Sequence, residues 1–166
     1  MHPFTAAFLV ALTLSTALRL WLAARHISHV AANREHVPPE FSERIAIEAH
    51  RKAADYSRAK TRLGILGTLI GTALLLAFTL GGGLQTLSEA WSGTFESGGY
   101  AHGIALILSM GFVSAIIELP LDAYRTFVLE ARFGFNRTTP TLFIADLAKQ
   151  TLVGLALGVP LLYCVL

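Results

Sequence analysis

The chain has 166 residues, of which 54% are hydrophobic and only 14% are charged. A soluble domain of this length does not need so much apolar surface, so the composition indicates an integral membrane protein. The formal net charge of +2 is too small to suggest a nucleic-acid-binding protein, and the single cysteine, Cys164, excludes an internal disulfide and a thiolate metal cluster.

Four apolar stretches are long enough to cross a bilayer as helices. They cover about residues 4–24, 63–80, 102–121 and 147–166, and a spanning helix needs about 20 mostly apolar residues. The sequence therefore predicts an all-α integral membrane fold with four transmembrane helices in one membrane domain, residues 1–166. In the second span Gly67 and Gly71 form a Gly-xxx-Gly pair, which allows close packing either within the chain or between two copies.

Positive charges are unevenly distributed between the spans. Residues 25–62 contain eight Lys and Arg, residues 81–101 contain none, and residues 122–150 contain four. Because positively charged connectors stay in the cytoplasm, we expect residues 25–62 and 122–150 to be cytoplasmic and the N-terminus to lie outside. The first span carries its positive charges after the apolar run, which predicts an uncleaved anchor and not a signal peptide.

The first connector contains a long segment of helix-forming residues. No Gly or Pro occurs between Glu40 and Gly64, so we predict a helix from Glu40 to Leu80, about 60 Å long at 1.5 Å per residue. A narrow apolar stripe follows this helix at spacings of three and four: Phe41, Ile45, Ala49, Ala53 and Tyr56. Three interpretations remain open: the stripe docks against another domain, the basic residues lie on anionic headgroups, or the helix is a solvated stalk.

The second connector, residues 81–101, is glycine-rich at both ends and contains Trp91, Phe95 and Tyr100. Aromatic residues of these types settle at the level of the lipid headgroups, so we predict an interfacial loop.

No set of residues in the chain has the spacing of a catalytic or metal site. There is no His-Glu-x-x-His, no Gly-x-Ser-x-Gly and no phosphate-binding glycine loop. Glu118 is the most unusual polar residue, because it lies among apolar residues in the third span, just before Pro120. It is expected either to pair with Arg19 or Arg125 as a structural clasp or to line a polar interior. Pro120 predicts a kink or a helix end.

Residues 118–150 closely resemble the block that joins the third and fourth membrane helices of type I CAAX prenyl proteases. The matching elements are Leu119-Pro120, Tyr124, Thr126-Phe127-Val128, Glu130, Gly134-Phe135-Asn136, Thr138 or Thr139, Phe143, Asp146 and Lys149. The order of a first span, a long charged helix and a second span agrees with that family more weakly.

The resemblance implies a ring of membrane helices around a large chamber, with a zinc site on the cytoplasmic side. In the family, a His-Glu-x-x-His helix and a downstream glutamate hold the zinc, and the motif glutamate activates the attacking water. This chain has no His-Glu-x-x-His, so no catalytic residue and no metal ligand is assigned to it. We expect it to bind no zinc and to be inactive alone, the catalytic zinc domain being truncated from this sequence or supplied by a separate polypeptide.

The resemblance also suggests a role for residues at the connector. We expect six of them to support the interface with the chamber or the catalytic domain: Glu118, Tyr124, Glu130, Phe135, Asn136 and Asp146. The predicted function is thus the membrane domain of a zinc-dependent metalloendopeptidase, in a bacterial inner membrane, with the lipid bilayer, the catalytic domain and a peptide substrate as partners. The alternatives are a non-catalytic scaffold that binds hydrophobic or lipidated peptides and a small transporter subunit.

Overall fold

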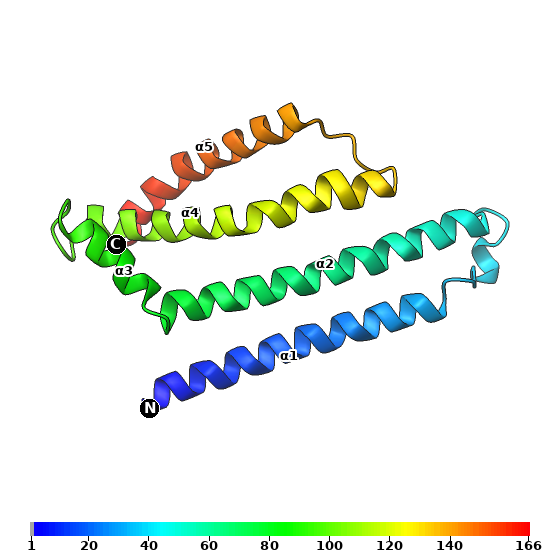
Figure 1. Cartoon of the computed structure of the whole chain (residues 1–166), viewed down its shortest axis with the longest axis horizontal. Coiled ribbons are helices and arrows are strands. Elements are labelled where there is room, and N and C mark those ends of the chain that lie inside the picture. The colour runs from blue at the N-terminus through cyan, green and yellow to red at the C-terminus, as the bar shows by residue number, and fades with distance from the viewer. Residues whose placement is uncertain (1) are drawn as a thin grey trace. The chain divides into compact units, whose positions relative to one another are not determined.

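The computed structural model describes residues 2–166, and every regular element in them is helical (Figure 1). In chain order the elements are α1 (Pro3–Ala32), a 3₁₀ turn η1 (Pro39–Phe41), α2 (Ile47–Thr79), α3 (Gly83–Ser92), α4 (Tyr100–Tyr124), a π-helical segment η2 (Arg125–Glu130) and α5 (Pro140–Val165). Four helices are long and apolar enough to cross a membrane: Pro3–Ala32, Ile47–Thr79, Tyr100–Glu130 and Pro140–Val165. The predicted all-α membrane fold with four spans is confirmed.

The helices extend beyond the apolar stretches from which they were predicted. α1 continues to Ala32, because residues 25–32 contain no helix breaker and remain helical outside the apolar run. α5 begins at Pro140, where the Thr139 hydroxyl oxygen accepts a hydrogen bond from the N–H of Leu142 (3.2 Å). A threonine cap followed by proline at the first helical position is a strong start signal, so the helix begins before its apolar part.

The long helix before the second span is shorter than predicted. α2 begins at Ile47, not at Glu40, and its 33 residues are about 50 Å long. Ahead of it the Ser42 hydroxyl donates to the carbonyl of Pro39 (2.8 Å), and the N–H of Ile45 donates to the carbonyl of Phe41 (2.9 Å). These local bonds form a turn in place of the first helical turns. The acidic residue in the first turn of α2 is consequently Glu48.

The second connector is not simply a loop, because it contains the ten-residue helix α3. Its glycines make the reversal after α2 possible. Gly82 has a φ of 77°, in the left-handed region that favours glycine. A Cβ on Gly81 would lie 2.7 Å from the carbonyl oxygen of Ala77. The backbone therefore returns so closely upon α2 that a side chain does not fit at Gly81.

Pro120 does not end the third span. α4 continues through it to Tyr124, and the next six residues adopt the wider π-helical turn of η2. A π-helical segment is a recognised way to accommodate irregular hydrogen bonding within a long helix. Of the two expectations for Pro120, the helix end is wrong and the kink stays a prediction. The π-helical part of the helix lies C-terminal to the proline.

The described residues form two compact units. The first consists of residues 2–73 and 121–136, in which α1 and α2 lie side by side and antiparallel (Figure 1). Two contacts fix their register: the hydroxyls of Thr16 and Thr72 are 3.2 Å apart, and His26 Nε2 lies 3.0 Å from the Ser57 hydroxyl. A Cβ on Gly67 would lie 3.3 Å from Leu121 Cδ2. Gly67 therefore packs within the chain. Of the two interpretations of the glycine pair, packing within the chain is the one that this contact favours.

The second unit consists of residues 74–120 and 137–166. α5 returns to the beginning of α4, where the rings of Tyr100 and Tyr163 have centroids 5.5 Å apart. α3 packs against α4 through the Trp91 indole N–H, which donates to the Ser109 hydroxyl (2.9 Å). Most apolar side chains on these helices are exposed, as expected for helices that meet lipid or further protein and not water.

Candidate functional site: the connector after the third span

The connector that follows α4 is held in a defined shape by its own backbone. The carbonyl of Glu130 accepts hydrogen bonds from the N–H groups of Phe135 (2.9 Å) and Asn136 (3.2 Å), and the N–H of Gly134 donates to Ala131 (3.0 Å). Gly134 has a φ of 72°, which allows the tight reversal because glycine lacks a Cβ. The Gly134-Phe135-Asn136 element is thus a structured turn that closes on the end of η2.

Aromatic contacts attach this turn to α2. The ring of Tyr56 lies edge-on to both Phe133 (centroids 5.4 Å apart) and Phe135 (4.8 Å). The ammonium of Lys52 lies 5.4 Å from the centroid of the Phe135 ring, a favourable cation–π distance. Phe133 is buried, together with Leu129 of η2. The connector therefore rests on the polar half of α2.

The polar end of the α1–α2 hairpin carries a network of ion pairs. Arg34 donates to both carboxylate oxygens of Asp55, from Nε (2.9 Å) and from Nη2 (2.8 Å), which is the strong bidentate arrangement. Arg51 Nε donates to Glu35 (2.7 Å). This bond, and more weakly that from Arg34, holds the pKa of Glu35 below its usual value against the opposing effect of desolvation, and its carboxylate partners raise the pKa of Arg34.

The predicted apolar stripe on this helix docks only in part. Tyr56 contacts the connector of the same chain, whereas Phe41 and Ile45 precede α2 and are exposed. The buried alanine is Ala54, not Ala53. Because α2 begins at Ile47, Phe41 and Ile45 are not part of this helix. The prediction of one continuous stripe was therefore wrong for its N-terminal half.

The six predicted support residues fall in both units. Tyr124, Glu130, Phe135 and Asn136 belong to the connector of the first unit, whereas Glu118 on α4 and Asp146 on α5 belong to the second. Of the four in the first unit, Glu130, Phe135 and Asn136 are joined by the backbone bonds of the turn, and Tyr124 is an exposed residue at the end of α4. Glu118 is exposed and Asp146 partly so.

The expected clasp with Glu118 is not formed through Arg125. The ion pair of Arg125 is made with Asp122 (3.3 Å), one turn back in the same helix. Side chains three residues apart are neighbours on a helix surface, whereas Glu118 lies seven residues from Arg125, so the pair with Asp122 is favoured. The alternative pairing of Glu118 with Arg19 stays a prediction, since the two residues belong to different units.

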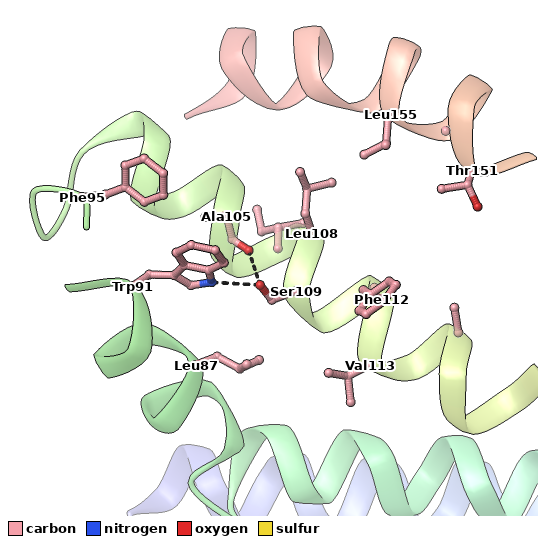
Figure 2. Close-up of a pocket in the computed structure, with 14 residues that line it drawn as sticks. Leu87, Trp91, Phe95, Ala105, Leu108, Ser109, Phe112, Val113, Thr151 and Leu155 are labelled. Carbon is pink, nitrogen blue, oxygen red and sulfur yellow. Dashed lines mark hydrogen bonds between the residues drawn. The ribbon is translucent and has the colours of Figure 1, made fainter. Parts of the chain in front are cut away.

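The second unit contains an apolar cavity of about 950 Å³ between α3, α4 and α5 (Figure 2). Trp91, Phe95, Leu108, Phe112 and Leu155 are among its lining residues. The polar atoms of Trp91 and Ser109 satisfy each other, and the Ser109 hydroxyl donates onward to the carbonyl of Ala105 (2.7 Å). The wall of this cavity is therefore apolar, and a volume of this size is typical of ligand pockets.

His102 connects α3 to the start of α4. It is buried, its Nε2 lies 3.1 Å from the carbonyl oxygen of Ser88, and its Nδ1 accepts from the N–H of Gly98 (3.4 Å). Both ring nitrogens lie within hydrogen-bond distance of backbone groups. The histidine thus closes the loop that precedes α4.

A zinc ion does not fit the residues described. Nowhere in residues 2–166 do three or more His, Cys, Asp or Glu side chains gather closely enough to hold a metal ion. His26 and His29, one helical turn apart, have separate hydrogen-bond partners: His26 lies against Ser57, and His29 against Asn33.

Comparison with known proteins places this architecture in a family. Residues 26–166 match the family model described as the CAAX prenyl protease N-terminal region with five membrane helices. The chain belongs to the CAAX prenyl protease family. The resemblance of residues 118–150 is thereby confirmed, and it extends over most of the chain. Within residues 2–166 there are four helices long enough to span, against five in the description of the family.

Curated relatives show the same relationship. A CAAX prenyl protease 1 homolog of Caenorhabditis elegans is 34% identical over 127 residues, which are 76% of this chain and 27% of that protein. CAAX prenyl protease 1 of Saccharomyces cerevisiae is 30% identical over 136 residues, 76% of this chain and 30% of that protein. The chain therefore spans only about a third or less of the length of these relatives.

A solved structure has the same fold as the chain. The crystal structure of S. mikatae Ste24p superposes with a TM-score of 0.87 at 25% identity, covering 99% of this chain and 39% of that one. The chain thus corresponds to the N-terminal membrane part of a CAAX prenyl protease.

Sequence reasoning missed the residues that fix the connector to α2. Phe133 and Leu129 are buried there, yet neither stands out in a connector that also has exposed aromatics. A signal did exist in Gly134, since a glycine between two phenylalanines marks a turn that presents both rings to one neighbour.

Proposed function

We propose that this chain is the N-terminal membrane domain of a zinc-dependent metalloendopeptidase of the CAAX prenyl protease type. The observation that carries the proposal is the family match over residues 26–166, together with relatives that are named as CAAX prenyl proteases. The catalytic residues are supplied from outside residues 2–166, either by the same polypeptide or by a separate one. Zinc, when bound there, supplies an activated water for attack on the peptide carbonyl.

In this proposal the residues of the chain position the peptidase and do not react. The turn at Gly134-Phe135-Asn136 is closed on Glu130 and packed on Tyr56, so it presents a rigid surface next to the membrane. Rigid support matters because a displacement of about 1 Å at a catalytic group costs on the order of 100-fold in rate. Glu118, Tyr124, Glu130, Phe135, Asn136 and Asp146 are proposed as supports of this kind.

The test of the activity uses the whole reading frame that contains residues 1–166, together with neighbouring genes. We expect a His-Glu-x-x-His motif there, and the purified membrane protein should cleave a CAAX peptide in a reaction abolished by a zinc chelator and restored by zinc. Farnesylated and unmodified peptides should be compared, because the substrate is part of the proposal. The absence of the motif, together with no cleavage, would overturn it.

A non-catalytic scaffold for hydrophobic or lipidated peptides is the second candidate. The apolar cavity between α3, α4 and α5 favours it, since an apolar wall of this kind suits a hydrophobic ligand. Binding of a lipidated peptide by a protein without peptidase activity, lost on Phe112→Trp, would support this candidate over the first.

The proposed orientation places residues 25–62 and 122–150 in the cytoplasm of a bacterial cell and the N-terminus outside the inner membrane. The charge distribution of the connectors supports it. In a Cys164→Ser background, a membrane-impermeant maleimide should label Glu96→Cys in intact cells and Arg44→Cys only after the membrane is opened. The reverse pattern would invert the orientation.

A further inference from the structure

Four positive side chains lie where the α1–α2 hairpin enters its apolar part: Arg25, Arg58, Lys60 and Arg62. Arg25 follows the apolar stretch of residues 4–24, and Arg62 precedes the stretch of residues 63–80. His26 Nε2 lies 3.0 Å from the Ser57 hydroxyl, so the two helices are in register at this level. The four side chains therefore form a cationic band at one depth of the membrane protein.

Aromatic rings mark this depth as the level of the lipid headgroups. The guanidinium of Arg25 lies 4.9 Å from the ring centroid of Trp21, and the ammonium of Lys60 lies 5.7 Å from that of Tyr56. Trp and Tyr are enriched at the membrane–water interface, where their rings are partly apolar and partly polar. Trp21 is exposed and suits this level, whereas the ring of Tyr56 also packs against Phe133 and Phe135 of the same chain.

The carboxylates of the hairpin do not neutralise the cationic band. Glu35 is paired with Arg34 and Arg51, and Asp55 accepts from Nε and Nη2 of Arg34. Arg58 reaches Asp55 only at 3.8 Å, with a carboxylate that Arg34 already occupies. The ion pairs formed within residues 2–166 include none with Arg25, Lys60 or Arg62.

Arg58 also has an unused donor. Its Nε atom is buried and has no hydrogen-bond acceptor in the described part of the chain. A buried N–H without a partner is less stable than a paired one. The rest of the Arg58 side chain is partly exposed, so a phosphate would meet the other guanidinium donors and not the buried Nε.

We propose that the cationic band binds the phosphate groups of anionic phospholipids. A phosphate oxygen accepts from guanidinium and ammonium donors together, and its charge complements a band that the protein leaves unneutralised. The level of the band, less than two helical turns from the apolar stretches, fits lipid phosphates better than a ligand from bulk solution. The bound headgroups would fix the depth of the α1–α2 hairpin, a role separate from any peptidase activity.

The first experiment measures binding of phosphatidylglycerol by the full chain in nanodiscs of phosphatidylcholine with increasing phosphatidylglycerol. The test variant is Arg25→Gln/Lys60→Gln/Arg62→Gln. Its matched control is Arg44→Gln/Lys52→Gln/Arg137→Gln, three cations that are also exposed but lie farther from the apolar stretches. At about fivefold per lost charge near the lipid surface, the test variant should bind phosphatidylglycerol on the order of 100-fold more weakly, and the control should bind nearly as the wild type does. Equal loss in both variants would refute a localised band.

The second experiment tests the guanidinium of Arg58 and uses a change that keeps the charge. Arg58→Lys should weaken phosphatidylglycerol binding severalfold, while the unfolding temperature in pure phosphatidylcholine changes little, because the ion pair with Asp55 is already long. Binding by the wild type should also weaken as salt is raised, since exposed charges are screened. Full affinity in Arg58→Lys, or insensitivity of the wild type to salt, would contradict the proposal.

Two further binding measurements distinguish a lipid phosphate from a soluble phosphate and from an acidic peptide. In nanodiscs of pure phosphatidylcholine, soluble glycerol phosphate and a poly-glutamate peptide should each bind far more weakly than phosphatidylglycerol does. Tight binding of glycerol phosphate would indicate a site for a free phosphate ligand, and tight binding of the peptide would indicate a docking surface for an acidic protein segment. Either result would overturn the lipid assignment.

Discussion

The ring of Phe135 meets the ring of Tyr56 edge-on, with centroids 4.8 Å apart and planes inclined by 65°. This contact joins two segments that are far apart in the sequence, the polar half of α2 and the turn after η2. Because Tyr56 also touches the buried Phe133, it is the centre of the interface between them. The stretch that most closely resembles the CAAX prenyl proteases is therefore anchored by a residue outside that stretch.

Truncation of these rings should loosen the connector in a graded way. Phe133→Ala removes a buried ring and should cost about 3–5 kcal/mol of unfolding free energy, whereas Phe135→Ala removes a half-exposed one and should cost about 1 kcal/mol. Tyr56→Ala should fall between them. Hydrogen exchange at the amides of Phe135 and Asn136 should accelerate in all three variants, because these amides donate to Glu130 within the turn.

The control for the connector variants is Phe4→Ala, at an exposed phenylalanine near the start of α1. It should leave the exchange of the Phe135 and Asn136 amides unchanged. An equal acceleration in Phe4→Ala would show that the effect reflects general destabilisation of the membrane domain and not loss of the Tyr56 contacts.

The glycine pair in α2 offers a second, sharper comparison. A Cβ at Gly67 would lie 3.3 Å from Leu121 Cδ2, while one at Gly71 would meet nothing within 4 Å. Gly67→Leu should therefore destabilise the protein by about 1–3 kcal/mol through overpacking, and Gly71→Leu should be close to neutral. Thermal unfolding in the same detergent measures both. Equal effects would indicate that Gly71 faces another copy of the chain and not open space.

The sequence was sufficient for the helices but not for their ends. Apolar length predicts four spans, and charge distribution predicts which connectors are polar, because both depend on local composition. The start of α2 depends instead on whether residues 42–46 hydrogen-bond locally, as Ser42 does to Pro39. The start of α5 depends on the cap that this helix obtains from Thr139. Such choices between a turn and a helix differ by little free energy, so composition does not decide them.

Side-chain partners were predictable to a smaller degree. The resemblance identified Phe135 and Asn136, yet Tyr56 was placed only on an apolar stripe with no named partner. Long-range pairs depend on how helices pack, which no spacing along one helix reveals. Arg125 illustrates a further limit: Glu118 was one expected partner, and the structure pairs Arg125 with Asp122, which is nearer along the same helix.

The loop between α3 and α4 should depend on His102. His102→Ala would leave the N–H of Gly98 and the carbonyl of Ser88 without their present partner, and each lost hydrogen bond should cost about 0.5–1.5 kcal/mol. Thermal unfolding and proteolysis of residues 93–99 measure this loss. His36→Ala, at an exposed histidine outside the helices, is the matched control and should change neither measurement. An unchanged unfolding temperature in His102→Ala would mean that water replaces the imidazole.

Acid should weaken the polar end of the α1–α2 hairpin through Glu35. Its pKa is held below the usual value by Arg51 first and by Arg34 second. A carboxylate whose pKa is lower in the folded state contributes stability that is present above its unfolded pKa and is lost as the pH falls through its folded pKa. Loss of stability should thus begin near the ordinary glutamate value of about 4.3 and continue below it.

Thermal unfolding measured from about pH 6 to about pH 3 follows this loss across the usual glutamate pKa. Glu35→Gln should lower the unfolding temperature at neutral pH and flatten the acid dependence, because the titrating group is absent. Glu43→Gln, at an exposed glutamate that precedes α2, should leave both unchanged. An acid dependence that persists in Glu35→Gln would assign it to another carboxylate, with Asp55 next to be tested since it is bound to the same Arg34.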